Sequence, residues 1–546
     1  MKLCDLIVPM YVAFIPNRKS PPAVLLRESV RDGKKIVKRT IANLSSWPSA
    51  KVENLRRVLS GENIGASSEP ECGKIWAAMD VLNQMANEIG LGDAIGNSKM
   101  AKLVKFLIFA RIGHQGSRLS SVRWANEHCV AEILGLKDFD ENDLYDALDW
   151  IASQQERVEL RLYEKYLSVN KGPPVLVLYD VTSSYFEGEN NELAEYGYNR
   201  DGKRGKKQIV IGLLTDAKGE ALSVSVFKGN TGDPATVETQ IEKLVNRFKI
   251  KEVVFVGDRG MVKAKGKELC EKFQFKYISA LTDPQVRKLI KSDVIQPSLF
   301  DYTVSEVETD GKRLVLRTDE LTQRKERHRR EDKLNKLMTL IKERNEFVKE
   351  STSAKPESGL GQLTTWAKKH KLLSFVTLSL KENQIEITVD KDAKEQSATL
   401  DGCYVIESDV PKEMMSTQDV HDRYKDLQKV ERDFRSMKTG LLEVRPIYLR
   451  NGERTQGHVF IAMLGLKLSR AIEARLTAHF GTTDIDPHAT TLEDAIHALS
   501  RICLLHYTIG DQKVVGLPRP DVRQNEILDC LKIKLSIPKS KAPPAA

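Results

Sequence analysis

The sequence predicts an α/β protein built around a mixed sheet with flanking helices. In residues 174–282 three strand-like segments come first, and helices and strands then alternate. The turn residues Asp216 to Gly219 separate the second and third segments, which favours an antiparallel meander. Asp233 and Pro234 provide a capping acid and an early proline for the first helix. We expect strands at 175–185, 208–215, 221–228, 252–257 and 276–280, and helices at 234–248 and 264–273.

Two smaller regions precede this core. Residues 1–70 predict a basic β-hairpin unit, because strand-like segments at 24–30 and 35–41 flank an Asp-Gly turn. The apolar stretch 6–15 is too short to span a bilayer and is expected to be a strand. Residues 71–170 show apolar residues every three to four positions, which predicts a helical region that is a candidate for DNA binding.

The pattern changes after residue 282. Residues 283–409 predict an inserted, mostly β subdomain, with strands at 312–317, 374–380, 384–389 and 402–406 and a long charged helix at 319–349. Residues 410–480 are expected to return to the core as helices at 417–437 and 453–479. Residues 481–546 are expected to form a C-terminal helical region with a disordered tail.

The charge distribution points to a polyanionic partner. The chain of 546 residues has 85 Lys and Arg against 76 Asp and Glu, a net charge of +9. Residues 1–70 alone hold 12 basic and 6 acidic side chains. Attraction to phosphates is the main sequence-independent term in DNA binding, although a solvated basic surface is the alternative interpretation.

The remaining composition argues against metal–thiolate and membrane classes. The seven cysteines are scattered singly, without a C-x-x-C pair, which disfavours zinc and disulfide frameworks. The apolar run 459–468 is too short to cross a membrane. We therefore expect a cytoplasmic protein without a membrane partner.

Three acidic residues stand out as metal ligands. Asp180 and Asp258 each lie where an apolar, β-branched run stops, so each carboxylate is expected near the end of a buried strand. Glu431 lies on an amphipathic helical segment that can bring a third carboxylate to the other two. Three hard oxygen ligands suit Mg²⁺ or Mn²⁺.

The helix around Glu431 has a regular spacing of its own. Tyr424, Glu431 and Lys438 are seven residues apart and so lie close to one stripe of a helix. One face thus presents an aromatic ring, an acid and a cation in line. A solvated helix with a Glu431–Arg435 pair is the alternative.

This combination resembles the DDE transposases of bacterial insertion sequences, in the branch with a Y-x2-R-x3-E-x6-K signature. Tyr424, Glu431 and Lys438 match three of the four fixed positions, and Leu427 replaces the arginine. Arg423, Arg432 or Arg435 are candidates to take over a phosphate contact of that arginine. The segments GYNRDGKRGKKQIVIGLL, FKGNTGDPATV, VGDRGM, LLEVRPIY and RTQGHVFIAMLGL also look like parts of such proteins, in the expected order.

The resemblance implies a ribonuclease H-like catalytic fold, with an insertion between the second and third acids. It implies that Asp180, Asp258 and Glu431 are the catalytic residues and hold two Mg²⁺ ions per site, with Mn²⁺ as a substitute. Such ions activate the nucleophile and neutralise the leaving 3′ oxygen. Water would first cut the strand at the element's end, and the freed 3′-OH would then attack target DNA.

Several residues are expected to contact DNA, each with a competing role. Lys438 is expected to contact a phosphate, and the alternative is a surface charge. Tyr424 is expected to position the end of the DNA strand, and the alternative is a packed ring. The basic loop from Arg200 to Lys207 is expected to follow the DNA backbone, and the alternative is a solvated hairpin tip. Arg259 is also an ion-pair candidate for Asp258, His458 also a structural histidine, and Asn230 and Asp233 are read as loop and cap residues. The full DNA-binding set is Tyr424, Lys438, Arg435, Arg200, Lys203, Arg204, Lys206, Lys207, Arg259 and His458.

The expected function is therefore binding of terminal inverted repeats and target DNA, followed by cleavage and strand transfer, with a homodimer in the synaptic complex. Two alternatives remain open. One is a DNA-binding transposase remnant without catalysis. The other is a ribonuclease H-like nuclease that cuts DNA without joining it.

Overall fold

A computed structural model describes residues 10–18, 21–32, 35–61, 71–188, 190–203, 205–301, 304–351, 354–438, 442–482, 486, 489–509 and 512–537. The chain forms two compact units. One contains residues 82–124 and 134–474, and is called the core unit below. The other contains residues 1–81, 125–133 and 475–546, and is called the terminal unit. Each is considered by itself.

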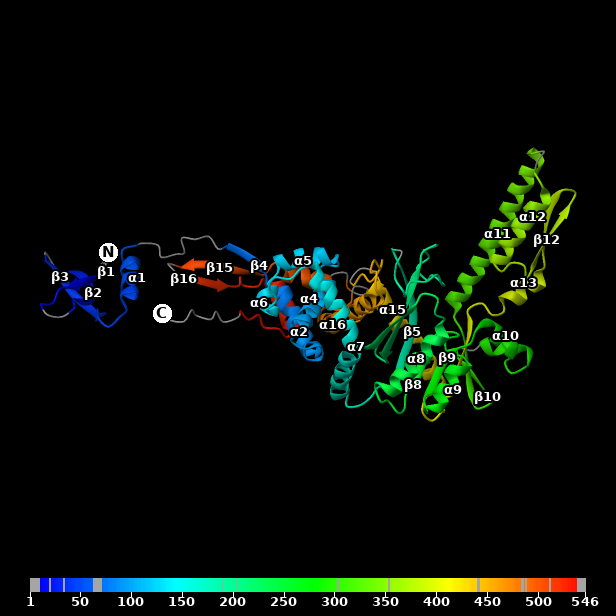
Figure 1. Ribbon diagram of the computed structural model, residues 1–546, viewed down its shortest axis with the longest axis horizontal. Coiled ribbons are helices and arrows are strands. Elements are labelled where there is room, and N and C mark those ends of the chain that lie inside the picture. The colour runs from blue at the N-terminus through cyan, green and yellow to red at the C-terminus, as the bar shows by residue number, and fades with distance from the viewer. Residues whose placement is uncertain are drawn as a thin grey trace, which may run out of the picture. The chain divides into compact units, whose positions relative to one another are not determined.

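The core unit is built on an eight-stranded mixed sheet, with strand order β10-β11-β14-β9-β8-β5-β6-β7 (Figure 1). The strands β5, β6 and β7 form the predicted antiparallel meander, while β8 and β9 run parallel to β5. All five strands predicted for residues 174–282 are therefore present. The bounds are β5 (Leu176–Tyr185), β6 (Gln208–Asp216), β7 (Ala221–Lys228), β8 (Val254–Gly257), β9 (Lys276–Ala280), β10 (Ser305–Thr309), β11 (Lys312–Thr318) and β14 (Cys403–Ser408).

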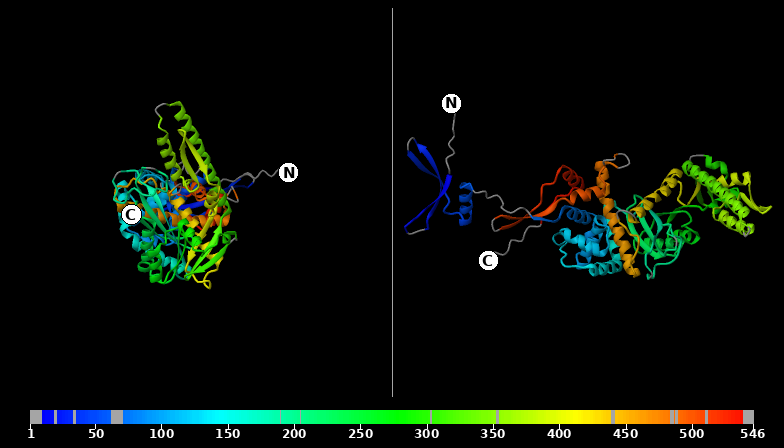
Figure 2. Two further views of the ribbon diagram at one scale, coloured as in Figure 1. Left: turned by 90° about the vertical axis from the view of Figure 1, so that its right-hand side faces the viewer. Right: turned by 90° about the horizontal axis from the view of Figure 1, so that it is seen from above.

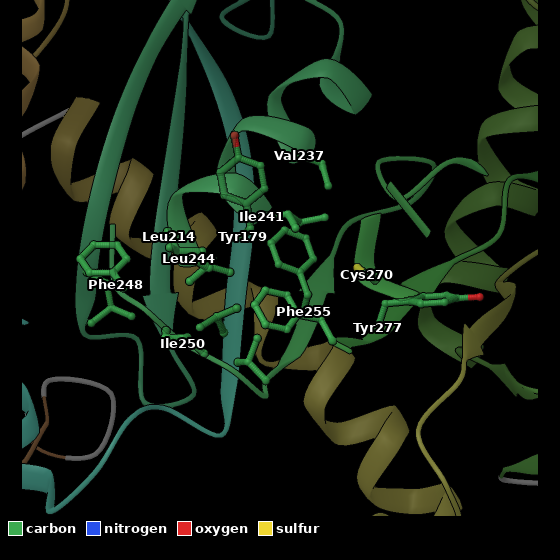
Figure 3. Packing of buried hydrophobic residues seen from close by; sticks show 14 of the residues in the cluster. Tyr179, Leu214, Val237, Ile241, Leu244, Phe248, Ile250, Phe255, Cys270 and Tyr277 are labelled. Carbon is green, nitrogen blue, oxygen red and sulfur yellow. The ribbon is translucent and has the colours of Figure 1, made fainter. Parts of the chain in front are cut away.

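One face of this sheet packs on the helices that connect its strands. Figure 3 shows Tyr179 of β5 and Phe255 of β8 among Val237, Ile241 and Leu244. The last three residues belong to α8 (Asp233–Asn246), and α9 (Ala264–Lys272) packs beside that helix. Side chains alternate between the two faces of a strand, so the neighbours of Tyr179 and Phe255 point to the opposite face. This alternation decides where the acidic residues point.

Further helices complete the core unit. The predicted helical region contains α3, α4 and α7, and residues 459–464 of α16 are completely buried. No described helix is long and apolar enough to span a membrane. The bounds are α3 (Leu91–Ile95), α4 (Lys99–Gly113), α7 (Glu141–Asn170), α10 (Asp283–Lys291), α14 (Thr417–Lys425) and α15 (Leu427–Lys438). Four described helices contain residues of both units: α2 (Ala77–Glu88), α5 (Arg118–Glu127), α6 (Val130–Leu134) and α16 (Gly452–Phe480).

The inserted segment differs from its prediction. Three of its strands, β10, β11 and β14, extend the main sheet next to β9 and do not form a separate β subdomain. Its middle part has a core of its own, where two helices pack side by side and against a two-stranded sheet (Figures 1 and 2). The insertion also begins with α10 and a short 3₁₀ helix. The bounds of the middle part are α11 (Glu320–Glu350), α12 (Pro356–Lys369), β12 (Val376–Lys381), β13 (Gln384–Val389) and α13 (Lys391–Ala398).

The terminal unit contains the predicted N-terminal strands and some elements that the sequence did not predict. Strands β1 (Met10–Ile15), β2 (Ala23–Asp32) and β3 (Lys35–Asn43) form one antiparallel sheet, and an unpredicted helix, α1 (Ser49–Leu59), covers it. The Asp-Gly turn includes Gly33, which lies outside the described residues.

The C-terminal region was predicted to be helical, but it also contains strands. Its strand β15 (Cys503–Ile509) pairs with both β16 (Gln512–Gly516) and β4 (Glu71–Ile75). The helices are α6 (Val130–Leu134), α17 (Leu492–Leu499) and α18 (Val522–Leu531). The tail was predicted for residues 536–546, of which residues 538–546 lie outside the described part of the chain.

Candidate active site

Asp180 and Asp258 lie side by side on the neighbouring inner strands β5 and β8. Asp180 lies in the middle of β5, and not near its end as predicted, whereas Asp258 directly follows β8. Strands β5 and β8 are parallel neighbours, and Tyr179 pairs with Gly257 in their register. Asp180 and Asp258 occupy the next position of each chain. Neighbouring strands are about 5 Å apart. Because Tyr179 and Phe255 point toward α8, both carboxylates point to the opposite face of the sheet.

The helix that carries Glu431 covers this opposite face. Helix α15 packs on β5 through a buried apolar side that includes Val430, Phe434 and Met437. Glu431 itself is exposed. The predicted single helix is interrupted at Asp426, between α14 and α15. Because α15 packs on this face, Glu431 lies on the same side of the sheet as Asp180 and Asp258.

Arg313 fixes the entry to this helical segment. Its side chain is buried in β11, where it donates hydrogen bonds to the carbonyl oxygens of Val410 (3.0 Å) and Met415 (2.7 Å). Glu306 of β10 balances its charge across a 2.8 Å ion pair. The strands of the insertion thus hold the residues that immediately precede α14.

The three carboxylates are close enough to influence one another. Burial raises the pKa of Asp180 to about 7, and the negative charges of Asp258 and Glu431 contribute to that increase. Glu431 is exposed as a whole, but partial desolvation of its carboxyl group raises its pKa, and the charge of Asp258 adds to the increase. A strongly perturbed carboxyl group beside like charges is typical of a functional site.

Two of these acids are engaged in hydrogen bonds. The Tyr424 hydroxyl donates to Asp258 Oδ1 at 3.0 Å, and the backbone amide of Val181 donates to Asp180 Oδ1 at 2.7 Å. Burial and the neighbouring Asp258 charge raise the pKa of Tyr424, so the hydroxyl stays protonated and remains a donor. Tyr424 therefore contacts the acid site directly.

The donor chemistry of the three acids fits a hard divalent cation, because carboxylate oxygens are the ligands that Mg²⁺ and Mn²⁺ prefer. A cation would also relieve the mutual repulsion that raises the pKa of Asp180. In the arrangement seen here, however, no three His, Cys, Asp or Glu side chains of the described residues are placed to hold one ion. Cation binding would require the carboxylates to move closer together.

The signature cation Lys438 is buried at the end of α15 and donates to Asp201 Oδ1 at 2.9 Å. Burial lowers its pKa, and the bond to Asp201 opposes that effect. Leu427, at the position of the signature arginine, is also buried and packs inside the protein. Of its possible substitutes, Arg423 pairs with Asp426, while Arg435 lowers the pKa of Glu431.

The basic loop at residues 200–207 follows the end of β5 across the hairpin. Nη2 of Arg200 donates to both carboxylate oxygens of Asp233, at 2.9 and 2.8 Å. Lys206 pairs with Glu187 at 2.6 Å, and Lys203 and Lys207 lie over the rings of Tyr185 and Tyr196, respectively. Arg204 lies outside the described residues. Arg200 and Lys206 are thus paired with nearby acids, whereas Lys203 and Lys207 contact aromatic rings.

The weaker candidates have distinct surroundings. Arg259 pairs with Asp283 at 2.9 Å and not with Asp258. His458 is buried; Arg118 donates to its Nδ1 at 3.0 Å, and its Nε2 donates to the Val444 carbonyl at 3.2 Å. Its pKa is well below the usual value because of burial and two arginines. A neutral histidine with both nitrogens in use has a structural role.

Asp233 also differs from its interpretation as a helix cap. It is the first residue of α8, Gly232 takes the N-cap position, and no side chain caps the helix there. Its carboxylate holds Arg200 instead.

Sequence reasoning missed three features beside the acids. Asp201 is almost completely buried between Lys438 and Arg445, although it lies in a run of cations that predicts an exposed loop. Tyr196 and Tyr198 are 64% and 82% exposed next to that loop. Aromatic rings among cations are a signal for nucleic-acid binding that could have identified the two tyrosines.

Comparison with family models identifies the family of this chain. A family model described as a transposase DDE domain matches residues 171–466, and the chain belongs to the DDE transposases. A second model, described as the IS1634 family transposase N-terminal domain, matches residues 12–71. The chain is therefore a DNA-transposing enzyme by family, of the kind that insertion sequences encode. A comparison with curated proteins gave no match.

Two solved structures show a distant likeness. One is a piggyBac transposase synaptic complex with hairpin DNA, at 8% identity over 78% of this chain and 76% of that chain, with a TM-score of 0.34. The other is the Mos1 strand transfer complex, at 14% identity over 42% and 67% of the two chains, with a TM-score of 0.15. These scores are too low to establish a shared fold in detail.

The raised pKa of Asp180 predicts a specific effect of pH on stability. Between the ordinary value of 3.8 and about 7, the folded protein holds a proton that the unfolded chain has released. Folding therefore loses stability as the pH rises through this window. We expect Asp180→Asn to raise the melting temperature of chelator-treated protein at pH 8, with the difference shrinking toward pH 4. Thermal melting across that range checks the prediction, and a variant that is less stable at pH 8 would contradict it.

The surroundings of His458 predict a loss of stability without a loss of DNA contacts. His458→Ala leaves Arg118 and the Val444 carbonyl without their partner, which should cost about 1–3 kcal/mol in the free energy of unfolding. Urea denaturation measures this cost, with the exposed His328 as a control, since His328→Ala should change stability by less than about 0.5 kcal/mol. A shallower salt dependence of DNA binding in His458→Ala would instead indicate that this histidine contacts DNA.

Proposed function

We propose that this transposase binds the terminal inverted repeats of an insertion sequence, cuts the DNA at its ends and joins the freed 3′ ends to target DNA. The observation that carries the proposal is the convergence of Asp180, Asp258 and Glu431 on one face of the sheet, where their charges influence one another. Cleavage and joining need no covalent protein intermediate, so one acidic site can serve both steps.

Asp180, Asp258 and Glu431 would hold two Mg²⁺ ions, with Mn²⁺ as a substitute. Divalent ions bound there supply activation of the attacking oxygen and stabilisation of the departing 3′ oxygen. Asp258 and Glu431 both contribute to the raised pKa of Asp180, which supports one shared site for the three acids. The role of the protein is then to keep three like charges on rigid elements.

Tyr424 and the basic residues would position the DNA strand. The Tyr424 hydroxyl lies on Asp258 and stays protonated, so it can reorient to donate to a phosphate when Asp258 binds a cation. The loop after β5 would follow the DNA backbone through its cations Arg200, Lys203, Lys206 and Lys207. Three of the four positions of the Y-x2-R-x3-E-x6-K signature support assignment to that branch. We further propose a homodimer in the synaptic complex and a cytoplasmic location.

The two alternatives make different predictions for one assay. With a labelled element end and a supercoiled plasmid, a transposase cuts the end and joins it to the plasmid. A nuclease cuts without joining, and a catalytically inactive remnant binds without cutting. Both the triad and the N-terminal family match favour the first outcome. A labelled end that is bound but never joined, with Mg²⁺ or Mn²⁺ present, would overturn the proposal.

The triad predicts a clean separation of cutting from binding. Asp180→Ala, Asp258→Ala and Glu431→Gln should each abolish cleavage, because each removes a carboxylate from the site. Binding of the element end should change little, since other residues contact the DNA. Cleavage gels and binding titrations measure the two effects.

Asp310→Asn is the matched control for these variants. Asp310 is an exposed acid in the β10–β11 turn with a positive φ of 49°, a conformation that asparagine also tolerates. This control should cut at the wild-type rate. Retained cleavage in any of the three triad variants removes that residue from the site.

A further inference from the structure

A small hollow lies beside Glu431 and is surrounded by cations. Its volume is about 260 Å³, and it is open to solvent. Four cations from three segments line it, together with two acids: Arg200, Arg435, Lys438 and Arg445, with Asp201 and Glu431. A basic hollow at a site that cuts DNA is suited to a phosphate group.

Asp201 ties this hollow together. Its side chain is 2% exposed, and its Oδ1 accepts hydrogen bonds from Lys438 at 2.9 Å and Arg445 at 2.5 Å. Its Oδ2 accepts one from the backbone amide of Tyr185 at 3.1 Å. One carboxylate thus joins the end of β5, the end of α15 and the segment that follows α15.

The charges around Asp201 do not cancel. Lys438 and Arg445 carry two positive charges against the single negative charge of Asp201, which leaves one positive charge. Arg200 is matched by Asp233, and Arg435 lies near Glu431, whose pKa it lowers. The surplus positive charge of the hollow therefore belongs to Lys438 and Arg445. A phosphodiester group carries one negative charge and would neutralise it.

We propose that Arg445 and Asp201 complete the phosphate contact that the family signature implies for Lys438. Asp201 holds Lys438 and Arg445 in place, and the two cations form a seat for one phosphodiester group of the DNA strand cut beside Glu431. The proposal rests on the function proposed above and deepens it. Asp201 is a positioning residue, because it acts through the two cations and is too buried to contact DNA itself. Arg445 is 26% exposed and presents a planar guanidinium that can bind phosphate oxygens through two N–H groups.

The first test removes only the charge of Asp201. Asp201→Asn leaves two unneutralised cations, so binding of a short DNA duplex without divalent ions should become tighter. The slope of log affinity against log salt should steepen by about one. Cutting should nevertheless slow about tenfold or more, because the cations lose their fixed position. Tighter binding combined with slower cutting is not expected from a residue that only stabilises the fold.

Asp433→Asn is the matched control. Asp433 lies on α15, the helix that carries Lys438. Its side chain is as buried as that of Asp201 and pairs with Arg470 at 2.6 Å, but it does not line the hollow. The substitution makes the same change in charge. It should affect melting temperature and leave the salt slope close to that of the wild-type protein.

The second test changes the cations and covers the case in which Asp201→Asn folds poorly. Arg445→Gln and Lys438→Ala should each weaken duplex binding and make the salt slope shallower by about one. Unchanged slopes in both variants would overturn the seat, as would an Asp201→Asn protein that differs from the wild type in melting temperature alone. These slopes require no chemistry. Failure of the proposed function shows differently, as wild-type protein that binds element ends but never cuts or joins them.

Discussion

The parallel pairing of β5 with β8 is the constraint on which the acidic site depends. It places Asp180 and Asp258 at the same level of neighbouring strands, and the alternation of side chains sends both to the face under α15. A shift of one residue in either strand would send that acid to the face filled by α8. Tyr179 and Phe255, both completely buried, oppose such a shift because each would have to leave the apolar core.

This arrangement costs stability in the absence of a cation. Burial and like charges both disfavour the ionised form of Asp180, and the resulting pKa near 7 reflects that cost. The rest of the unit must offset it, and the buried cluster of β5, β6, β8 and α8 contributes to this (Figure 3). Proteins commonly retain such local instability where ligand binding removes it. We therefore expect the three acids to be more stable in this arrangement with a cation bound than without one.

Local signals in the sequence were sufficient for much of this site. Asp180, Asp258 and Glu431 each follow from a pattern within about ten residues: the end of an apolar run or the spacing along a helix. Pairing between distant segments was harder to predict. Strands β11 and β14 were assigned to a separate subdomain because nothing in their own sequence indicates that β14 pairs with β9 and β11 with β14. Asp201 was missed for the same reason, since its partners Lys438 and Arg445 are more than 230 residues away in the chain.

The long insertion between Asp258 and Glu431 helps to place the third acid. The chain leaves the sheet after β11 and returns as β14, and these two strands pair with each other, so the excursion begins and ends at neighbouring positions. Closing a longer loop costs little additional entropy when its ends are already fixed. Strand β14 also pairs with β9, and Arg313 of β11 binds the carbonyls just before α14. The paired strands at the base of the insertion therefore fix the start of α14, which leads into α15 and Glu431. The middle part of the insertion can vary without moving that acid.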